Sequence, residues 1–279
     1  MIRPAANAAT PGRSGRNAVA LLGLLALVAG PSRGEELDCL IQPWRDITLS
    51  AAIEGLVEEV LVERGDLVKR GDVVARLESS VERASVDAAR ARAEATGGIR
   101  SGEARLELAK TSFERQQTLQ QQKVVSSKEV DEALASKRVA EADLQSARED
   151  RKFAALELAQ AEALLARRTI HSPLDGVVVE RLLSAGEYAD PPEILKLAQV
   201  DPLRVEVYAP LELIGQISVG MRAEVRPEEP VGGVHEATVI VVDRVVDAAS
   251  ATFGVRLELP NPDYAIAAGL NCRVRFPTE

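Results

Sequence analysis

Apolar residues recur with two different periods along the chain, and each change of period marks a change of predicted structure. In residues 47–80, short runs rich in Val and Leu alternate with polar residues and end at glycines, which is typical of short strands joined by tight turns. Residues 169–200 repeat this pattern. The glycines expected to form structural turns are Gly55, Gly65 and Gly71 in the first segment and Gly176 and Gly186 in the second. The two segments therefore predict two related halves of one pseudo-symmetric β-sandwich.

Residues 81–168 lie between these halves and have helical character. They contain no proline and are rich in Ala, Glu, Arg, Leu and Gln, which are good helix formers. A heptad seam runs through each half of the segment, apolar except at Lys137 and Arg151 in the second half. The positions are Ala95, Ile99, Gly102, Leu106, Ala109 and Phe113, then Val130, Ala133, Lys137, Ala140, Leu144, Ala147, Arg151, Ala154, Leu158, Ala161 and Leu165. This pattern predicts an antiparallel coiled-coil hairpin.

The hairpin is expected to be interrupted at two places. The seam stops between residues 120 and 127, where Ser127 begins a stretch that is typical of a helix N-cap. The pair Gly97-Gly98 disfavours the helix by about 1 kcal/mol per glycine and predicts a kink or break in the first arm. Arms of about 40 residues at ~1.5 Å per residue reach roughly 60 Å.

After residue 200 the strand period returns. Residues 201–279 contain several short alternating stretches separated by Gly and Pro, which predict a small β-barrel, and residues 35–46 are expected to supply an N-terminal strand that joins it. The predicted fold class is α+β and elongated. Cys39 and Cys272 lie in alternating apolar stretches at opposite ends of this part of the chain, and either a disulfide or two separately buried thiols fits their positions.

Residues 1–34 differ from the rest of the chain. Arg3, Arg13 and Arg16 precede an apolar run at 18–29, and small residues follow, which is the order of a cleaved secretory signal peptide. The run is too short to cross the ~30 Å hydrocarbon layer as a helix. We therefore expect export. The net charge of −9 weighs against a nucleic-acid partner, which requires a basic face.

This organisation resembles the periplasmic adaptors, also called HlyD-type membrane fusion proteins. The split half-motifs, the hairpin between them and the following barrel carry the resemblance, and the first half-motif is also similar to biotinyl and lipoyl carrier domains. The resemblance implies a non-enzymatic protein of the periplasm, associated with the inner membrane and without a cofactor. It implies an efflux system with an inner-membrane transporter and a TolC-type outer-membrane channel, and self-association into a hexameric ring. A resistance-nodulation-division transporter is favoured, with an ATP-driven (ABC-type) exporter as the alternative.

The hairpin tip matches the pattern by which related adaptors dock onto the channel. Arg115, Leu119 and Ser126 fit Arg-x3-Leu-x6-Ser, and Arg115 and Leu119 lie one helical turn apart on one face. A buried Leu contributes ~2 kcal/mol, while Arg and Ser offer directional hydrogen bonds. The alternative is an ordinary coiled-coil end, in which Arg is solvated and Leu closes the seam.

Three other classes of protein fit the residues less well. A carrier domain needs a Lys on the turn between the two halves, whereas here Ser79-Ser80 enters the hairpin and Lys69 lies at another turn. A hydrolase would have to use His171 or His235, and the adjacent triad residue types of 171–175 cannot adopt triad geometry in an extended segment. No His, Cys or Asp cluster has the spacing of metal ligands. A purely structural coiled-coil protein is the remaining alternative.

Overall fold

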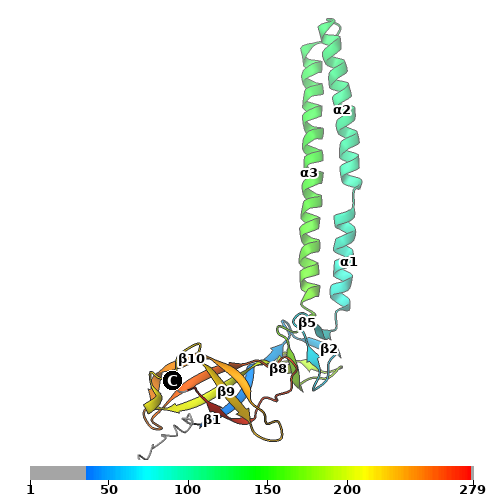
Figure 1. Cartoon of the computed structure of the whole chain (residues 1–279). Coiled ribbons are helices and arrows are strands. Elements are labelled where there is room, and N and C mark those ends of the chain that lie inside the picture. Colours follow the sequence, from blue (N-terminus) through cyan, green and yellow to red (C-terminus); the bar gives the residue numbers. More distant parts are fainter. Residues whose placement is uncertain (1–35, 278–279) are drawn as a thin grey trace, which may run out of the picture.

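The computed structural model describes residues 36–277, so the predicted signal peptide at 1–34 lies outside the described residues. The molecule is elongated, with a long helical hairpin standing on a small β-module that continues sideways into a barrel (Figure 1). This arrangement confirms the predicted fold class.

The β-module is a sandwich whose two halves exchange strands. Its elements are β2 (Gly55–Val60), β3 (Leu67–Val68) and β4 (Val73–Leu77) from the first half and β5 (Thr169–His171), β6 (Gly176–Arg181) and β7 (Tyr188–Ala189) from the second, followed by β8 (Glu193–Pro210). Strand β3 pairs with β6, and β2 pairs with β7. Each half therefore completes a sheet of the other.

Backbone hydrogen bonds repeat between the two halves and show their pseudo-symmetry. The Val57 N–H donates to the Glu187 carbonyl at 2.8 Å, and in the equivalent bond the Val178 N–H donates to the Asp66 carbonyl at 2.9 Å. The neighbouring turns use Gly65 and Gly186 at φ 95° and 89°, a left-handed conformation that glycine adopts without steric cost. The expected turn role therefore fits these two positions, and it also fits Gly71 at φ 93°.

Gly55 and Gly176 differ from the expectation, because they are not turn residues. They are the first residues of β2 and β6, and the left-handed region is not used at either position. Close approaches distinguish the two positions instead, because the neighbour of Gly176 is backbone and cannot give way, whereas the neighbour of Gly55 is the end of a flexible arginine side chain. A Cβ at Gly55 would lie 2.6 Å from Arg168 Nη1, and a Cβ at Gly176 would collide with the Ala198 carbonyl oxygen.

The barrel is a closed ring of six strands. It contains β1 (Glu36–Ser50), β9 (Arg222–Pro227), β10 (His235–Asp247), β11 (Thr252–Leu259) and β12 (Asn271–Arg275), together with β8. The order is β1-β12-β9-β10-β11-β8, and pairing of β1 with β8 closes the ring. Alternate residues of β11 are buried, which places Phe253, Val255, Leu257 and Leu259 in the core. A short 3-10 helix, η1 (Leu211–Leu213), follows β8.

The two longest strands belong to both β-units. β1 and β8 are continuous from the barrel into the sandwich and pair with each other along most of their length. The boundaries drawn from the sequence at residues 46 and 200 therefore fall inside unbroken strands. Two paired strands connect the barrel to the sandwich.

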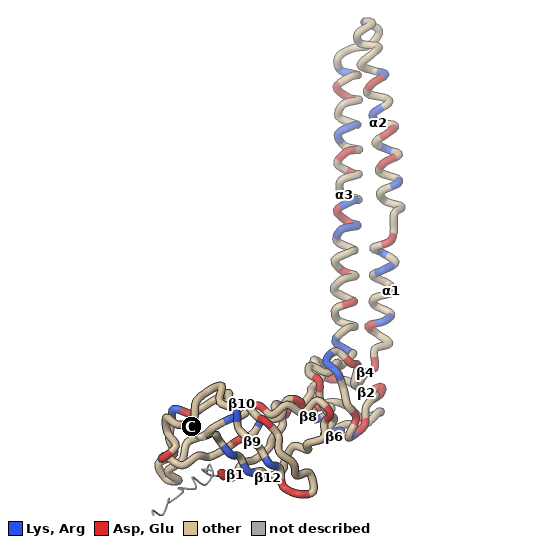
Figure 2. The backbone as a smooth tube through the Cα atoms, viewed as in Figure 1, with Lys and Arg blue, Asp and Glu red and all other residues tan. Residues whose placement is uncertain are grey.

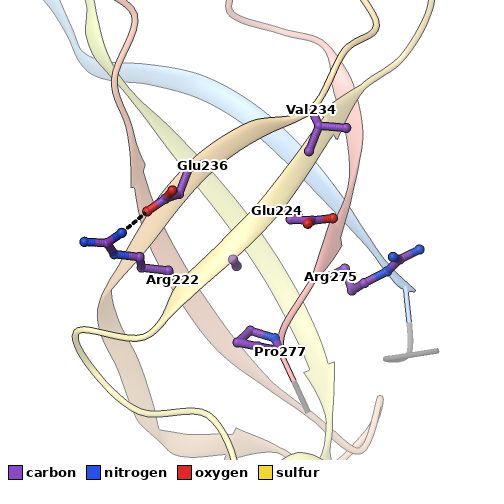
Figure 3. Close-up of a pocket in the computed structure, with 7 residues that line it drawn as sticks. Arg222, Glu224, Val234, Glu236, Arg275 and Pro277 are labelled. Atoms are coloured by element: carbon purple, nitrogen blue, oxygen red, sulfur yellow. Dashed lines mark ion pairs between the residues drawn. The ribbon is translucent and has the colours of Figure 1, made fainter. Parts of the chain in front are cut away.

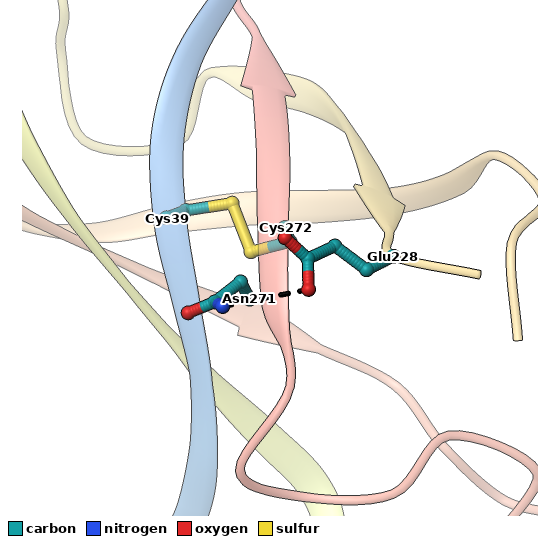
Figure 4. Close-up of a disulfide and its surroundings, with 4 residues drawn as sticks. All are labelled: Cys39, Glu228, Asn271 and Cys272. Atoms are coloured by element: carbon teal, nitrogen blue, oxygen red, sulfur yellow. Dashed lines mark hydrogen bonds between the residues drawn. A yellow bond between two sulfur atoms is a disulfide. The ribbon is translucent and has the colours of Figure 1, made fainter. Parts of the chain in front are cut away.

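The two cysteines are joined by a disulfide between the first and last strands of the barrel (Figure 4). Cys39 on β1 lies directly opposite Cys272 on β12, with 4.8 Å between their Cα atoms, within the range that disulfides use. Of the two arrangements that the sequence left open, the structure has the bonded one.

The hairpin consists of α1 (Ser80–Glu94) and α2 (Gly97–Gln121) packed against α3 (Ser127–Ala166). The first arm is broken at Ala95-Thr96, immediately before the glycine pair that predicted the interruption. The seam is largely as predicted, with Gly102 and Ala109 of α2 and Ala140 and Leu144 of α3 buried. Charged residues of both signs are distributed along both arms of the hairpin (Figure 2).

Two seam positions depart from the prediction, and both lie at the break. Ala95 and Arg151 are exposed. Because the helix is interrupted there, the Arg151 Nε can donate to the Ala93 carbonyl at 3.4 Å. The break thus accommodates a charged residue in the middle of the seam.

Candidate functional site at the hairpin tip

The connection between α2 and α3 is a compact turn closed by its own backbone. The Val124 N–H donates to the Leu119 carbonyl at 3.0 Å, and the Lys123 N–H donates to the Gln120 carbonyl at 2.8 Å. Lys123 adopts φ 61°, the left-handed conformation that commonly ends a helix and that is uncommon for a residue other than glycine. These bonds hold residues 119–124 in one arrangement at the far end of the hairpin.

The three residues of the docking pattern lie at this end, in different surroundings. Arg115 is exposed and Leu119 is half-buried one turn later on α2, while Ser126 is exposed and immediately precedes α3. Leu119 therefore lies between the two interpretations, because part of its side chain is covered and part is open to solvent.

Ser126 has a structural partner within the chain. The carboxylate of Glu129 accepts hydrogen bonds from the Ser126 backbone N–H at 2.8 Å and from its hydroxyl at 3.0 Å. These two bonds, the backbone one first, hold the pKa of Glu129 below its ordinary value. The N-cap is thus Ser126 and not Ser127, which is the first residue of α3. The predicted cap is wrong by one residue because the sequence offers two adjacent serines, and only Ser126 has Glu129 three positions later.

The sequence interpretation missed Val124. Its side chain is 66% exposed at the outermost turn, although it is apolar. The signal that could have identified it is the pair Val124-Val125, which is apolar within the otherwise polar stretch 120–127. In the sequence, that stretch marks only the end of the seam. Val124 adds apolar surface next to the solvent-exposed part of Leu119.

The residues of the rival interpretations have local structural partners. His171 Nδ1 lies 2.9 Å from the Gly71 carbonyl oxygen, and the Ser172 hydroxyl donates to the Leu174 carbonyl at 2.6 Å. Both polar groups are directed at backbone and not at each other. Lys69 lies in the turn between β3 and β4, where its N–H donates to Asp72.

Away from the hairpin tip, a hollow lies on the outer face of the barrel, and several of the side chains that line it form ion pairs (Figure 3). It has a volume of about 420 Å³, and within it Arg222 on β9 pairs with Glu236 on β10 at 2.9 Å. At its edge Arg275 pairs with Glu36 at 2.6 Å, and this hydrogen bond lowers the pKa of Glu36. Charges of opposite sign on neighbouring strands satisfy each other across this face.

No helix within residues 36–277 is long and apolar enough to cross a membrane. In the same range, no group of three or more His, Cys, Asp and Glu side chains is placed to hold a metal ion.

Two family models together match most of the chain. The model for a CzcB-like barrel-sandwich hybrid domain matches residues 45–198, which include the sandwich and the hairpin. The model for a CusB-like β-barrel domain matches residues 203–279.

The chain is also similar in sequence to curated proteins. The chain is 26% identical over 219 residues to the cobalt-zinc-cadmium resistance protein CzcB of Cupriavidus metallidurans, covering 78% of this chain and 40% of that protein. It is 26% identical over 239 residues to the macrolide export protein MacA of Yersinia pestis, covering 82% and 64%. The chain thus spans 40% to 64% of the length of these relatives.

A solved structure has the same fold. MacA from Actinobacillus actinomycetemcomitans superposes with a TM-score of 0.73 at 20% identity, covering 88% of this chain and 79% of that one. The matched domains include the split sandwich, the inserted hairpin and the closed barrel described above. The chain therefore belongs to the membrane fusion protein family of periplasmic adaptors, with a CzcB-like barrel-sandwich hybrid domain and a CusB-like β-barrel.

Proposed function

We propose that this protein is the periplasmic adaptor of a tripartite efflux system, which joins an inner-membrane transporter to a TolC-type outer-membrane channel for the export of small molecules. The observation that carries the proposal is the hairpin tip. The forty residues of α3 extend about 60 Å at 1.5 Å per residue, and the tip at their N-terminal end presents Arg115 and Leu119 of α2 and Val124 of the connecting turn. A long stiff arm with an apolar tip suits a partner at a distance from the β-domains.

The chemistry of the tip suits the helical mouth of a channel. Val124 and the exposed part of Leu119 supply apolar area, worth about 25 cal/mol per Å² when it is buried. Arg115 supplies up to five N–H donors for carbonyl or carboxylate groups. Ser126 contributes indirectly in this proposal, because its hydroxyl already donates to Glu129 and stabilises the start of α3.

We propose the other partners by analogy with the family. We assign the transporter to the resistance-nodulation-division class, which is supported by the CusB-like barrel. The adaptor is proposed to form a hexameric ring in the periplasm, after export with a cleaved signal peptide at residues 1–34. The mechanism is coupling and sealing, without a catalytic step. The names of the relatives cover divalent cations and macrolides, so the proposal specifies small molecules as a class.

The test is a pull-down of the outer-membrane channel with tagged tip variants. Val124→Asp is the cleaner variant, because a side chain that is 66% exposed can be replaced without disturbing the seam. Leu119→Asp should have the larger effect. Both variants should lose channel association, since a charge would be buried at the interface without a partner.

Leu108→Asp is the matched control. Leu108 is 74% exposed on the same helix, about 16 Å below Leu119 at 1.5 Å per residue. It should leave association unchanged. Normal channel recovery with both tip variants would contradict the docking proposal, and an ATP-driven transporter in the co-purified complex would replace the proposed transporter class.

A further inference from the structure

A groove lies at the junction between the barrel and the sandwich, away from the hairpin tip. Its volume is about 590 Å³, within the range of roughly 300–1,000 Å³ that is common for small-molecule sites. One wall is the outer face of the sandwich sheet, and the opposite wall is the barrel segment that connects β11 to β12, including Tyr264. We call this hollow the junction groove.

The sandwich wall is a single row of side chains across four strands. Leu67 on β3 pairs with Val177 on β6, Val177 pairs with Ala198 on β8, and Ala198 pairs with Asp46 on β1. Residues in one cross-strand row lie on the same face of a sheet. The row is therefore apolar over three strands and ends in one carboxylate.

This row faces away from the sandwich core. The adjacent residues Val178 and Leu197 are buried in the core, and successive residues of a strand point to opposite faces. Leu67 is consequently 58% exposed, although it lies on a paired strand. The row runs from this exposed leucine to Ala198, which is 3% exposed, and a connected apolar surface beside a concave wall differs from scattered surface leucines, which need no explanation.

The barrel wall is rigid before any ligand binds. The buried side chain of Asn261 donates to the carbonyls of Val200 and Ile266 at 2.9 Å each, and its oxygen accepts from the Ile266 N–H at 3.0 Å. Tyr264 lies within this pinned segment at φ 55°. Left-handed backbone at a bulky residue is strained, and such strain is retained where the surrounding structure enforces it, often at binding sites.

Among the described residues that line the groove, Asp46 is the only charged one. Within residues 36–277, neither Lys nor Arg forms an ion pair with it. Lys196, which lies on the same face, pairs with Glu180 at 2.8 Å, and Glu180 first and Asp46 after it contribute to raising the pKa of Lys196. The groove thus combines apolar walls and an aromatic ring with one carboxylate that makes no direct ion pair within the described residues.

We propose that the junction groove binds an amphipathic organic cation, with Asp46 as the counter-charge and the Leu67 row and Tyr264 as apolar walls. A desolvated cation gains from a carboxylate and from the face of an aromatic ring, while an anion of the same shape meets repulsion from Asp46. Because β1 and β8 link the barrel to the sandwich beside this groove, an occupant contacts both domains at once.

The experiment uses two probes of the same shape and opposite charge. Isothermal titration calorimetry of the exported chain with tetraphenylphosphonium should show one saturable site, and tetraphenylborate should bind at least tenfold more weakly. Asp46→Asn should weaken tetraphenylphosphonium binding about tenfold and reduce the difference between the two probes. Tyr264→Ala should weaken both probes.

Asp38→Asn is the matched control, because Asp38 is an exposed carboxylate on the same strand outside the groove. It should bind tetraphenylphosphonium like the unaltered chain. The proposal is overturned if tetraphenylphosphonium shows no saturable site, if tetraphenylborate binds equally well, or if Asp46→Asn binds unchanged while circular dichroism shows it folded. The measurement needs neither transporter nor channel, so its result is independent of the docking test.

Discussion

The barrel and the hairpin protect apolar surface in different ways. The barrel encloses a continuous buried cluster from Leu37 to Phe276, with Phe253 only 2% exposed. The hairpin buries a thin line of mostly small residues, among them Ala89, Ala109 and Ala161, and leaves Phe153 65% exposed. A closed sheet encloses an interior that large side chains can fill, whereas two packed helices bury only the narrow strip of residues along which they touch. Large side chains therefore stabilise the barrel, and close backbone approach stabilises the hairpin.

Removal of an aromatic side chain should give the largest difference in stability between the two regions. Phe253→Ala should lower the free energy of unfolding of the barrel by about 3–5 kcal/mol, because it removes buried area and leaves a cavity. Phe153→Ala on α3 makes the same chemical change at an exposed site and should stay within about 0.5 kcal/mol. Urea titration followed by circular dichroism measures both. Equal effects would contradict the distinction between core and seam.

The disulfide should matter for the barrel and not for the hairpin. Replacing both Cys39 and Cys272 by Ala should cost about 2–4 kcal/mol of barrel stability, since the bond closes a loop across 233 residues and ties the first strand to the last. The helical signal at 222 nm should melt at an unchanged temperature. A barrel transition that is insensitive to reduction would show that strand pairing alone holds β1 against β12.

Added volume should harm the hairpin where the helices touch. A Cβ at Gly102 would lie 3.1 Å from the Leu144 Cα, so Gly102→Leu should force the helices apart and cost about 1–3 kcal/mol. Gly97→Ala is the control on the same helix, because a Cβ there has no neighbour within 4 Å, and it should be neutral or stabilise slightly. Thermal unfolding at 222 nm compares them. A neutral Gly102→Leu would mean that the seam is loosely packed.

The smallest effect is expected at the exposed cap of α3. Bonds from Ser126 lower the pKa of Glu129 in the folded state, so this carboxylate stabilises the hairpin above its unfolded-state pKa. That contribution is lost as the pH falls from the ordinary value of 4.5 through the lower folded-state pKa. Glu129→Gln should therefore melt earlier than the unaltered chain at pH 7, and the difference should shrink as the pH falls below 4.5. Glu132→Gln, which removes an exposed ion pair to Lys128, should show a smaller difference at pH 7.

Local sequence determined the elements and their grouping. The two periods of apolar residues separate strands from helices, and Gly97-Gly98 marked the break of the first arm, because helix propensity and alternation act within a few residues. The repeated glycine spacing also indicated two related halves. The pairing of Cys39 with Cys272, by contrast, depends on β1 and β12 being neighbours in the ring. Proximity of chain ends is a property of the closed sheet.

Only the tertiary structure determined which side chains are exposed and which of them lie together on the surface. The sequence marked Leu119 as an exposed tip residue, but packing against α3 hides part of it and leaves Val124 as the more exposed apolar side chain. Gly55 and Gly176 are predicted in turns, but a Cβ at Gly176 would collide with the Ala198 carbonyl oxygen, and one at Gly55 would displace the flexible end of Arg168. The junction groove assembles Leu67, Val177, Ala198 and Asp46 from four strands. Such sites depend on which strands become neighbours, and that depends on the whole fold, because strand pairing joins residues that the chain itself keeps apart.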